Sequence, residues 1–357
     1  MSGCESISGF ESILGQEQPI RLLTTLFRNE TTPHALLLLG VEGVGKQTAA
    51  MAFAMACNCM VFEQKNLSEG TKTPADCYTT SDQITTIGPC GCCKSCRKIE
   101  SGNHPDIILV KPSGPFIRIG QIRDLCDTLA LKPYEARLRV VIISDAQAMN
   151  PSAGNALLKV LEEPPDQTIL ILTAMQTSDL LPTIVSRCQH IRFNPVSRKN
   201  IETLLIKRHK THPDDARIIA AIANGSVSKA FSMISSMNRA NWMNRRIWLI
   251  NEVESLSKKP IGSQMAFAEK LSKNKELLAD SLEVIKSWLR DLVVCKYHPG
   301  KIINKDLSDR IQRASKKMKV ISLLSKIDDI HSAQKDIQAN TNLRLTLEVL
   351  IMRLAKV

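Results

Sequence analysis

The chain has few aromatic residues, no long apolar run and no excess of acidic charge. Aromatic side chains make up 4% of its 357 residues, whereas hydrophobic residues of all kinds make up 43%. Such a composition favours a helix-rich protein with an aliphatic core over an all-β protein. No apolar run reaches the roughly 20 residues of a membrane-spanning helix, and segment 1–10 lacks the basic start and apolar core of a secretory signal. We therefore expect a cytoplasmic protein that does not cross a membrane.

Length and charge set broad limits on organisation and partners. A chain of 357 residues suffices for two or three domains, each with its own core. The net charge of +12 favours a polyanionic partner, and DNA is the obvious candidate. A solvated basic surface without a specific partner would give the same balance, so charge alone does not identify the partner.

Cysteine is abundant, and its spacing indicates a metal site rather than disulfides. The chain has 11 cysteines, and without an export signal a cluster with regular gaps is typical of metal binding. Cys90, Cys93 and Cys96 are separated by two-residue gaps, which allow neighbouring thiolates to converge on one ion. Zinc takes four such ligands in a tetrahedron, and the pattern offers no position for a catalytic water or a general base. We therefore expect a structural zinc ion.

The fourth zinc ligand has to come from another part of the chain. We assign it to Cys59, which lies at the end of the helix expected after a glycine-rich loop. The alternatives that the sequence leaves open are Cys57 and Cys77. Cys92 lies inside the cluster but breaks its two-residue spacing, and we expect it to be a bystander.

Short apolar runs alternate with helical patterns in the first half of the chain. Buried strands are expected at 34–39, 106–110, 139–143 and 168–173. Helices are expected at 48–57, 119–131 and 151–163. This alternation predicts an α/β fold with a parallel sheet covered by helices on both faces. The later part of the chain is helical, with an interruption expected at Asn224 and Gly225.

These patterns divide the chain into three expected domains. The first is an α/β domain that carries the cysteine cluster and a polar surface insertion at 60–89. The second is a small helical unit, and the third is an all-helical domain. Their boundaries are 1–195, 196–237 and 238–357.

A glycine-rich loop follows the first strand and precedes a helix, which is the setting of a phosphate-binding loop. Its glycines let backbone N–H groups turn toward phosphates, and the helix N-terminus adds positive potential. The candidate nucleotide-binding residues are Gly40, Gly43, Gly45, Lys46, Gln47 and Thr48. Gln47 occupies the position where a Ser or Thr hydroxyl would hold magnesium. The loop therefore predicts ATP binding without hydrolysis, or a loop that keeps its shape and binds nothing.

Several segments together resemble the bacterial AAA+ clamp-loader family. They include an Ile-Leu-Gly-Gln segment, a His-Pro-Asp segment, a Leu-Glu-Glu-Pro-Pro segment, a Ser-Arg-Cys segment and a Trp-Leu-Arg-Asp segment. Their positions are 13–16, 104–106, 161–165, 186–188 and 288–291. The resemblance covers nearly the whole chain except 60–89. It implies an AAA+ P-loop sheet with a zinc knuckle, a helical lid and an all-α collar that joins subunits.

The resemblance also indicates which branch of the family the chain is similar to. In the gamma and tau motor subunits an Asp-Glu pair ends the third strand, whereas this chain has Ser144 and Asp145 there. Together with Gln47, these departures resemble the delta-prime branch, whose own ATPase site is degenerate. The resemblance implies a chain that helps load the sliding clamp onto primed DNA, with gamma or tau and delta subunits as partners.

Arg187 of the Ser-Arg-Cys segment is implied to act as an arginine finger on the ATP of a neighbouring subunit. The chain would then have no covalent chemistry of its own, although it would serve a DNA-directed DNA polymerase holoenzyme. Two alternatives remain open. One is a gamma- or tau-type motor ATPase, and the other is a non-replicative nucleotide-binding module with a zinc knuckle.

Overall fold

A five-stranded parallel sheet forms the centre of the first of two units. The computed structural model describes residues 9–28, 32–60, 88–235, 239–338 and 341–356. Contacts within the chain divide it after Val196 into a first unit, 1–196, and a second unit, 197–357. Most of the insertion expected at 60–89 and the expected boundary at 237 lie outside the described residues. Among the described helices, none is both long and apolar enough to span a membrane.

The strands of the sheet lie in the order β2-β3-β4-β1-β5, and all neighbours are parallel. Their bounds are β1 Ala35–Leu39, β2 Ile107–Val110, β3 Arg139–Ile143, β4 Thr168–Ala174 and β5 Gln189–Arg192. The helices of this unit are α1 Glu17–Arg28, α2 Lys46–Cys57, α4 Lys94–Glu100, α5 Ile119–Leu129, α6 Pro151–Glu162 and α7 Pro182–Val185. The parallel α/β fold and its first four strands are confirmed.

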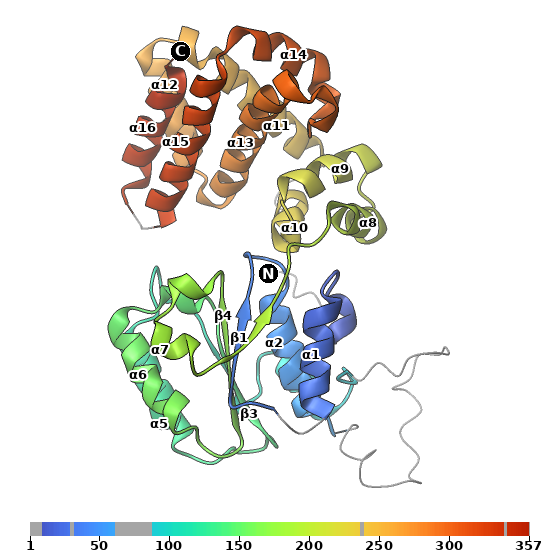
Figure 1. Cartoon of the computed structure of the whole chain (residues 1–357), viewed down its shortest axis with the longest axis vertical. Coiled ribbons are helices and arrows are strands. Elements are labelled where there is room, and N and C mark those ends of the chain that lie inside the picture. Colours follow the sequence, from blue (N-terminus) through green and yellow to red (C-terminus); the bar gives the residue numbers. More distant parts are fainter. Residues whose placement is uncertain (1–8, 29–31, 61–87, 236–238, 339–340, 357) are drawn as a thin grey trace. The chain divides into compact units, whose positions relative to one another are not determined.

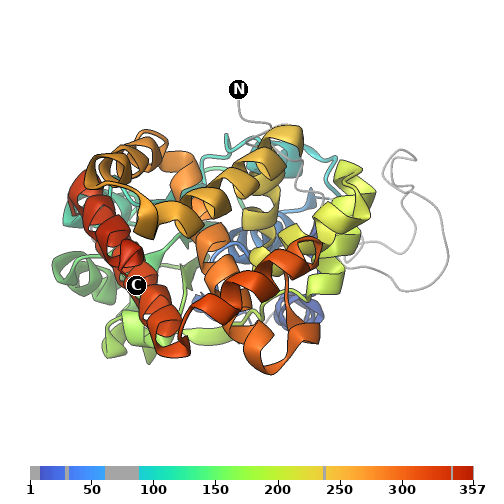
Figure 2. The same cartoon turned by 90° about the horizontal axis from the view of Figure 1, so that it is seen from above.

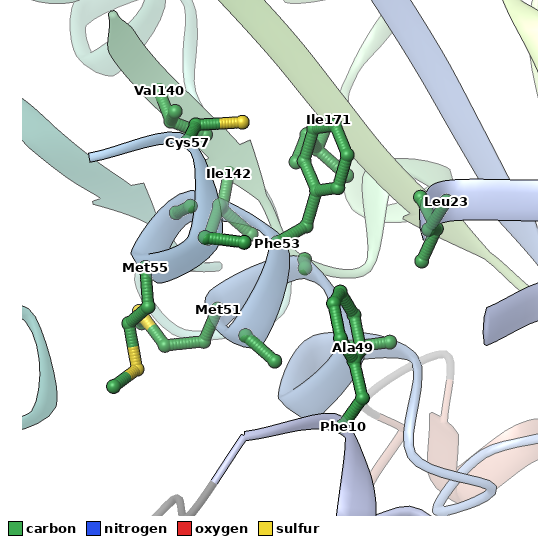
Figure 3. Close-up of a cluster of buried hydrophobic side chains, with 14 of the residues drawn as sticks. Phe10, Leu23, Ala49, Met51, Phe53, Met55, Cys57, Val140, Ile142 and Ile171 are labelled. Carbon is green, nitrogen blue, oxygen red and sulfur yellow. The ribbon is translucent and has the colours of Figure 1, made fainter. Parts of the chain in front are cut away.

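Helices cover both faces of the sheet because successive strand residues point to opposite sides. Leu36 and Leu38 of β1 pack on the face of α1 and α2, whereas Leu37 packs on the face of α5 and α6 (Figure 1). Phe53 of α2 points toward Ile171 of β4 (Figure 3). Strands β1, β3 and β4 are thus buried on both faces, which is why they are continuous apolar runs in the sequence.

Strand β5 has no apolar run, and the sequence analysis did not predict it. Of its residues only Ile191 is buried, because the strand lies at the edge of the sheet beside β1. Its exit passes very close to the end of β1: a Cβ on Gly40 would lie 2.5 Å from the carbonyl oxygen of Phe193. Gly40, with φ of 151°, is therefore required by the packing of β5 as well as by the loop that it begins.

Helix α5 ends two residues earlier than expected because a buried arginine binds the following carbonyls. The guanidinium of Arg139 donates to the carbonyl oxygens of Thr128, Leu131 and Lys132 at 2.7–2.9 Å. Pro133 also disfavours helix in the residue before it. The segment after α5 is thereby held as a fixed loop.

The second unit is helical in all its described regular elements. Its helices are α8 Arg198–His209, α9 Pro213–Ile222, α10 Val227–Ser235, α11 Arg239–Ser255, α12 Ile261–Ser272, α13 Lys275–Tyr297, α14 Ser308–Lys317, α15 Val320–Gln338 and α16 Leu343–Ala355 (Figure 2). Asn224 and Gly225 adopt positive φ values of 48° and 88° and interrupt the helical conformation between α9 and α10, as predicted. The division of this unit into lid and collar stays a prediction.

The Trp-Leu-Arg-Asp segment of α13 has a structural role in the second unit. Trp288 is buried, and the fully buried carboxylate of Asp291 accepts the backbone N–H groups of Ile303 and Asn304. Arg246 of α11 then donates to the side chain of Asn304 at 2.6 Å. This network joins α11, α13 and the loop before α14.

Candidate metal centre and phosphate loop

Four cysteine thiols converge at one end of the first unit. The Sγ atoms of Cys59, Cys90, Cys93 and Cys96 all lie within 4.8 Å of one another, and those of Cys90 and Cys96 are 4.0 Å apart. A tetrahedral zinc ion with Zn–S bonds near 2.3 Å separates its sulfur ligands by about 3.8 Å. The four cysteines therefore fit a zinc ion.

Backbone N–H groups point at three of these sulfur atoms. The amides of Cys90, Cys93 and Cys96 donate to the Sγ atoms of Cys59, Cys90 and Cys93 at 3.3–3.5 Å. Such donors stabilise a thiolate, which is the form that binds metal. Without a cation, burial raises the pKa of Cys90, and the bond to Cys59 together with burial raises the pKa of Cys96. Metal binding would therefore displace protons from this cluster.

The position of Cys59 is fixed by the end of helix α2. The side chain of Asn58 bridges the helix to the sheet, because it donates to the carbonyl of Leu138 at 2.9 Å and accepts the N–H of the same residue at 3.1 Å. Cys57, two residues earlier, lies beside Val140 in the core between α2 and the sheet (Figure 3). Burial raises the pKa of Cys57 to about 12.

Of the three candidates for the fourth ligand, the structure brings Cys59 to the cluster. Cys57 packs in the core instead, and Cys77 lies outside the described residues. Sequence alone could not decide among them, because the choice depends on where α2 ends relative to α4.

The glycine-rich loop lies between β1 and α2, at the carboxyl end of the sheet. Gly45 adopts a φ of 99° and immediately precedes the helix. Lys46 is buried, and its ammonium donates to the carbonyls of Gly40 and Val41 within the loop. Burial lowers the pKa of Lys46, and the carboxylates of Asp145 and Glu42 partly oppose this effect. The side chain of Gln47 is exposed, and that of Thr48 is half-buried.

The end of β3 faces the same loop but offers little to a metal. Ser144 is buried, and its hydroxyl has no hydrogen-bond partner among the described residues. Asp145 is exposed, has a positive φ of 53°, and donates its N–H to the hydroxyl of Thr173 at 3.0 Å. Thr173, at the end of β4, could not be singled out from the sequence.

Arg187 lies just after α7, and its guanidinium is partly exposed. One nitrogen, Nη1, donates to the carbonyl of Thr183 at 3.0 Å, and the other, Nη2, lies 2.8 Å from the carboxylate of Glu162. The exposed fractions of the two charged side chains are 36% for Arg187 and 51% for Glu162. Residues 162 and 187 are 25 positions apart and meet through packing of α7 on α6, so the sequence did not reveal this pair.

Asp106, the acid of the His-Pro-Asp segment, is structural. Its buried carboxylate accepts the backbone N–H groups of Tyr134, Glu135 and Ala136, each at 2.8 Å, and lies 3.4 Å from Arg139. Burial alone would raise the pKa of Asp106, but these donors outweigh burial and lower it. Asp106 therefore fixes the loop between α5 and β3 and is not free to do chemistry.

Two family models match most of the chain. The model described as "DNA polymerase III, delta subunit" matches residues 76–197, and the model described as "DNA polymerase III, delta subunit, C terminal" matches residues 240–356. The two matches fall in the first and second units, respectively.

Curated relatives carry similar names. The chain is 30% identical to DNA polymerase III subunit delta' of Bacillus subtilis (strain 168), over 95% of this chain and 96% of the relative. It is 38% identical to the subunit delta' of Pseudomonas aeruginosa, over 43% of this chain and 41% of the relative. It is also 24% identical to the subunit tau of Bacillus subtilis, over 97% of this chain and 61% of the relative.

Proposed function

The chain belongs to the family of DNA polymerase III subunit delta-prime, and from this premise we propose that it is the rigid, non-hydrolysing member of a clamp loader. In this role it helps load the sliding clamp onto primed DNA, together with gamma or tau motor subunits and a delta subunit. The observation that carries the proposal is the 30% identity to a delta-prime subunit over 95% of the chain. A subunit that acts on chromosomal DNA would work in the cytoplasm.

The nucleotide site supports the non-hydrolysing part of this proposal. Hydrolysis needs magnesium held by a hydroxyl and a carboxylate, and a carboxylate to prepare the attacking water. Gln47 is exposed where the hydroxyl is needed, and the buried Ser144 replaces the carboxylate. Lys46 and the loop amides are retained, so the site suits a bound nucleotide that is not turned over. The same features speak against a motor ATPase.

We assign a structural role to the cysteine cluster. Cys59, Cys90, Cys93 and Cys96 would hold a zinc ion, which supplies cross-linking between the end of α2 and helix α4 rather than reactivity. The N–H donors around the sulfur atoms and the fit of their spacing support this assignment.

Arg187 is our candidate for the residue that acts on a neighbouring subunit. Its guanidinium is partly exposed and lies outside the chain's own phosphate loop, at the end of α7. A guanidinium can bind phosphate oxygens in a bidentate manner and stabilise the charge that develops in phosphoryl transfer. Such arginines contribute about 10³-fold or more to the rate.

An omission experiment tests the proposed function directly. Motor and delta subunits, sliding clamp and primed DNA are combined with and without the purified chain, and clamp loading is followed by the clamp retained on circular primed DNA. We expect loading to require the chain. The non-replicative alternative predicts that the chain neither joins the other subunits in size-exclusion chromatography nor changes loading.

A further inference from the structure

The guanidinium of Arg187 is held on one edge by the carboxylate of Glu162. Nη2 of Arg187 lies 2.8 Å from Oε1 of Glu162, and Nη1 donates to the carbonyl of Thr183 at 3.0 Å. A guanidinium has five N–H donors. These two contacts restrict the rotation of the side chain. Among the contacts of the described residues they use two of the five donors, so the others can bind an outside group.

Close packing of two helices sets the position of this pair. Glu162 is the last residue of α6, and Arg187 follows the short α7. A Cβ on Gly154 of α6 would lie 2.8 Å from Cδ1 of Leu181, at the start of α7. The absence of a side chain at Gly154 leaves room for the side chain of Leu181. The carboxylate and the guanidinium meet because α7 packs on α6.

We propose that Glu162 is a positioning residue for Arg187: it holds the guanidinium in the orientation that reaches the phosphates of a neighbouring subunit. The inference rests on the role of Arg187 in the proposed function. A free arginine side chain loses rotamer entropy when it is fixed in one orientation. Glu162 already restricts the side chain of Arg187 before the neighbouring nucleotide binds. Less rotamer entropy is therefore lost when the transition state forms.

The expected effect is moderate because both side chains are partly exposed. Exposed ion pairs contribute at most about 1 kcal/mol, which corresponds to about a fivefold change in rate. We therefore expect Glu162→Gln to lower the kcat of ATP hydrolysis by the assembled loader about three- to fivefold. KM for ATP should stay unchanged, because Glu162 orients a transition-state contact and does not bind the substrate.

The adjacent Glu163 offers a matched control. It is exposed, it carries the same charge, and the described residues provide no ion-pair partner for it. The assay measures kcat and KM of the loader assembled with wild-type chain, Glu162→Gln, Glu163→Gln, Arg187→Ala and the Glu162→Gln/Arg187→Ala double variant. Size-exclusion chromatography verifies that each variant assembles.

The proposal predicts that the loader with Glu162→Gln has a lower kcat than the loader with Glu163→Gln. It also predicts that Glu162→Gln does not lower kcat further when Arg187 is already alanine. Equal kcat values for the two glutamine variants would overturn the proposal. A higher kcat for Glu162→Gln would overturn it too, because the carboxylate of Glu162 would then compete with the phosphate for the guanidinium of Arg187. If Arg187→Ala itself leaves turnover unchanged, the arginine assignment fails. If Arg187→Ala is slow while the glutamine variants do not differ, only the role of Glu162 fails.

Discussion

Individual side chains show how far local spacing predicts a site. Cys90, Cys93 and Cys96 could be recognised from their two-residue gaps, because those gaps alone bring the thiols to one side of a turn. Cys59 required a choice, since its distance from the others is set by the packing of α2 on α4. Thr173 and Glu162 were missed because their contacts form across the sheet and between helices, where sequence distance carries no signal.

The cysteine assignment predicts that substitutions of Cys57, the last residue of α2, and of Cys59, two residues later, differ in their effect on zinc content. Cys59→Ser should lower the zinc content of the purified protein from about one ion per chain to near none, because it removes one of four ligands. Its thermal unfolding midpoint should fall as well, since metal binding adds to folding stability. Elemental analysis and thermal unfolding measure the two effects.

Cys57→Ala is the control for this substitution. The thiol of Cys57 is buried beside Val140 and outside the cluster, so the variant should keep its zinc (Figure 3). Zinc lost from Cys57→Ala but kept by Cys59→Ser would show that the wrong cysteine had been assigned.

At the level of elements, strands with apolar sequences were predictable and the polar edge strand was not. Three strands are buried on both faces and therefore form apolar runs in the sequence, namely β1, β3 and β4. β5 has neighbours on one side only, so its exposed residues carry no periodic signal. The loop after α5 was also unpredictable, because it is held by Asp106 and Arg139, which come from two different strand regions.

The buried carboxylate of Asp106 predicts a pH-dependent stability. Its pKa is lowered in the folded protein, so it stabilises the fold above its unfolded pKa of about 3.9 and loses this effect as pH falls through the folded value. Asp106→Asn should therefore destabilise the protein at pH 7, by about 3 kcal/mol, because Arg139 is left buried without a charged partner.

Chemical denaturation of wild type and Asp106→Asn at several pH values measures this contribution. The difference in unfolding free energy between the two proteins should narrow below about pH 4. A difference that stays constant from pH 7 to the acid limit of folding would contradict the role given to the ionised carboxylate.

For the whole molecule, the sequence predicted family and architecture better than it predicted partners. Motifs spread from residue 13 to residue 291 led to the clamp-loader resemblance, and the comparison over 95% of the chain supports it. The net charge of +12 could not distinguish a DNA-binding protein from one with a solvated basic surface and no specific partner. Nor can one chain reveal the ATP site on which Arg187 acts, since that site belongs to another subunit.

The central claim is that the chain does not hydrolyse ATP and supplies Arg187 to a neighbouring subunit that does. The most direct test is magnesium-dependent ATP turnover by the chain alone and by the loader assembled with motor and delta subunits, clamp and primed DNA. We predict no turnover by the chain alone and high turnover by the assembly. Arg187→Ala should reduce the turnover of the assembly, with a loss of about 10³-fold at the one ATP site that Arg187 serves. Turnover by the chain alone that is abolished by Lys46→Ala would contradict the account and identify a motor.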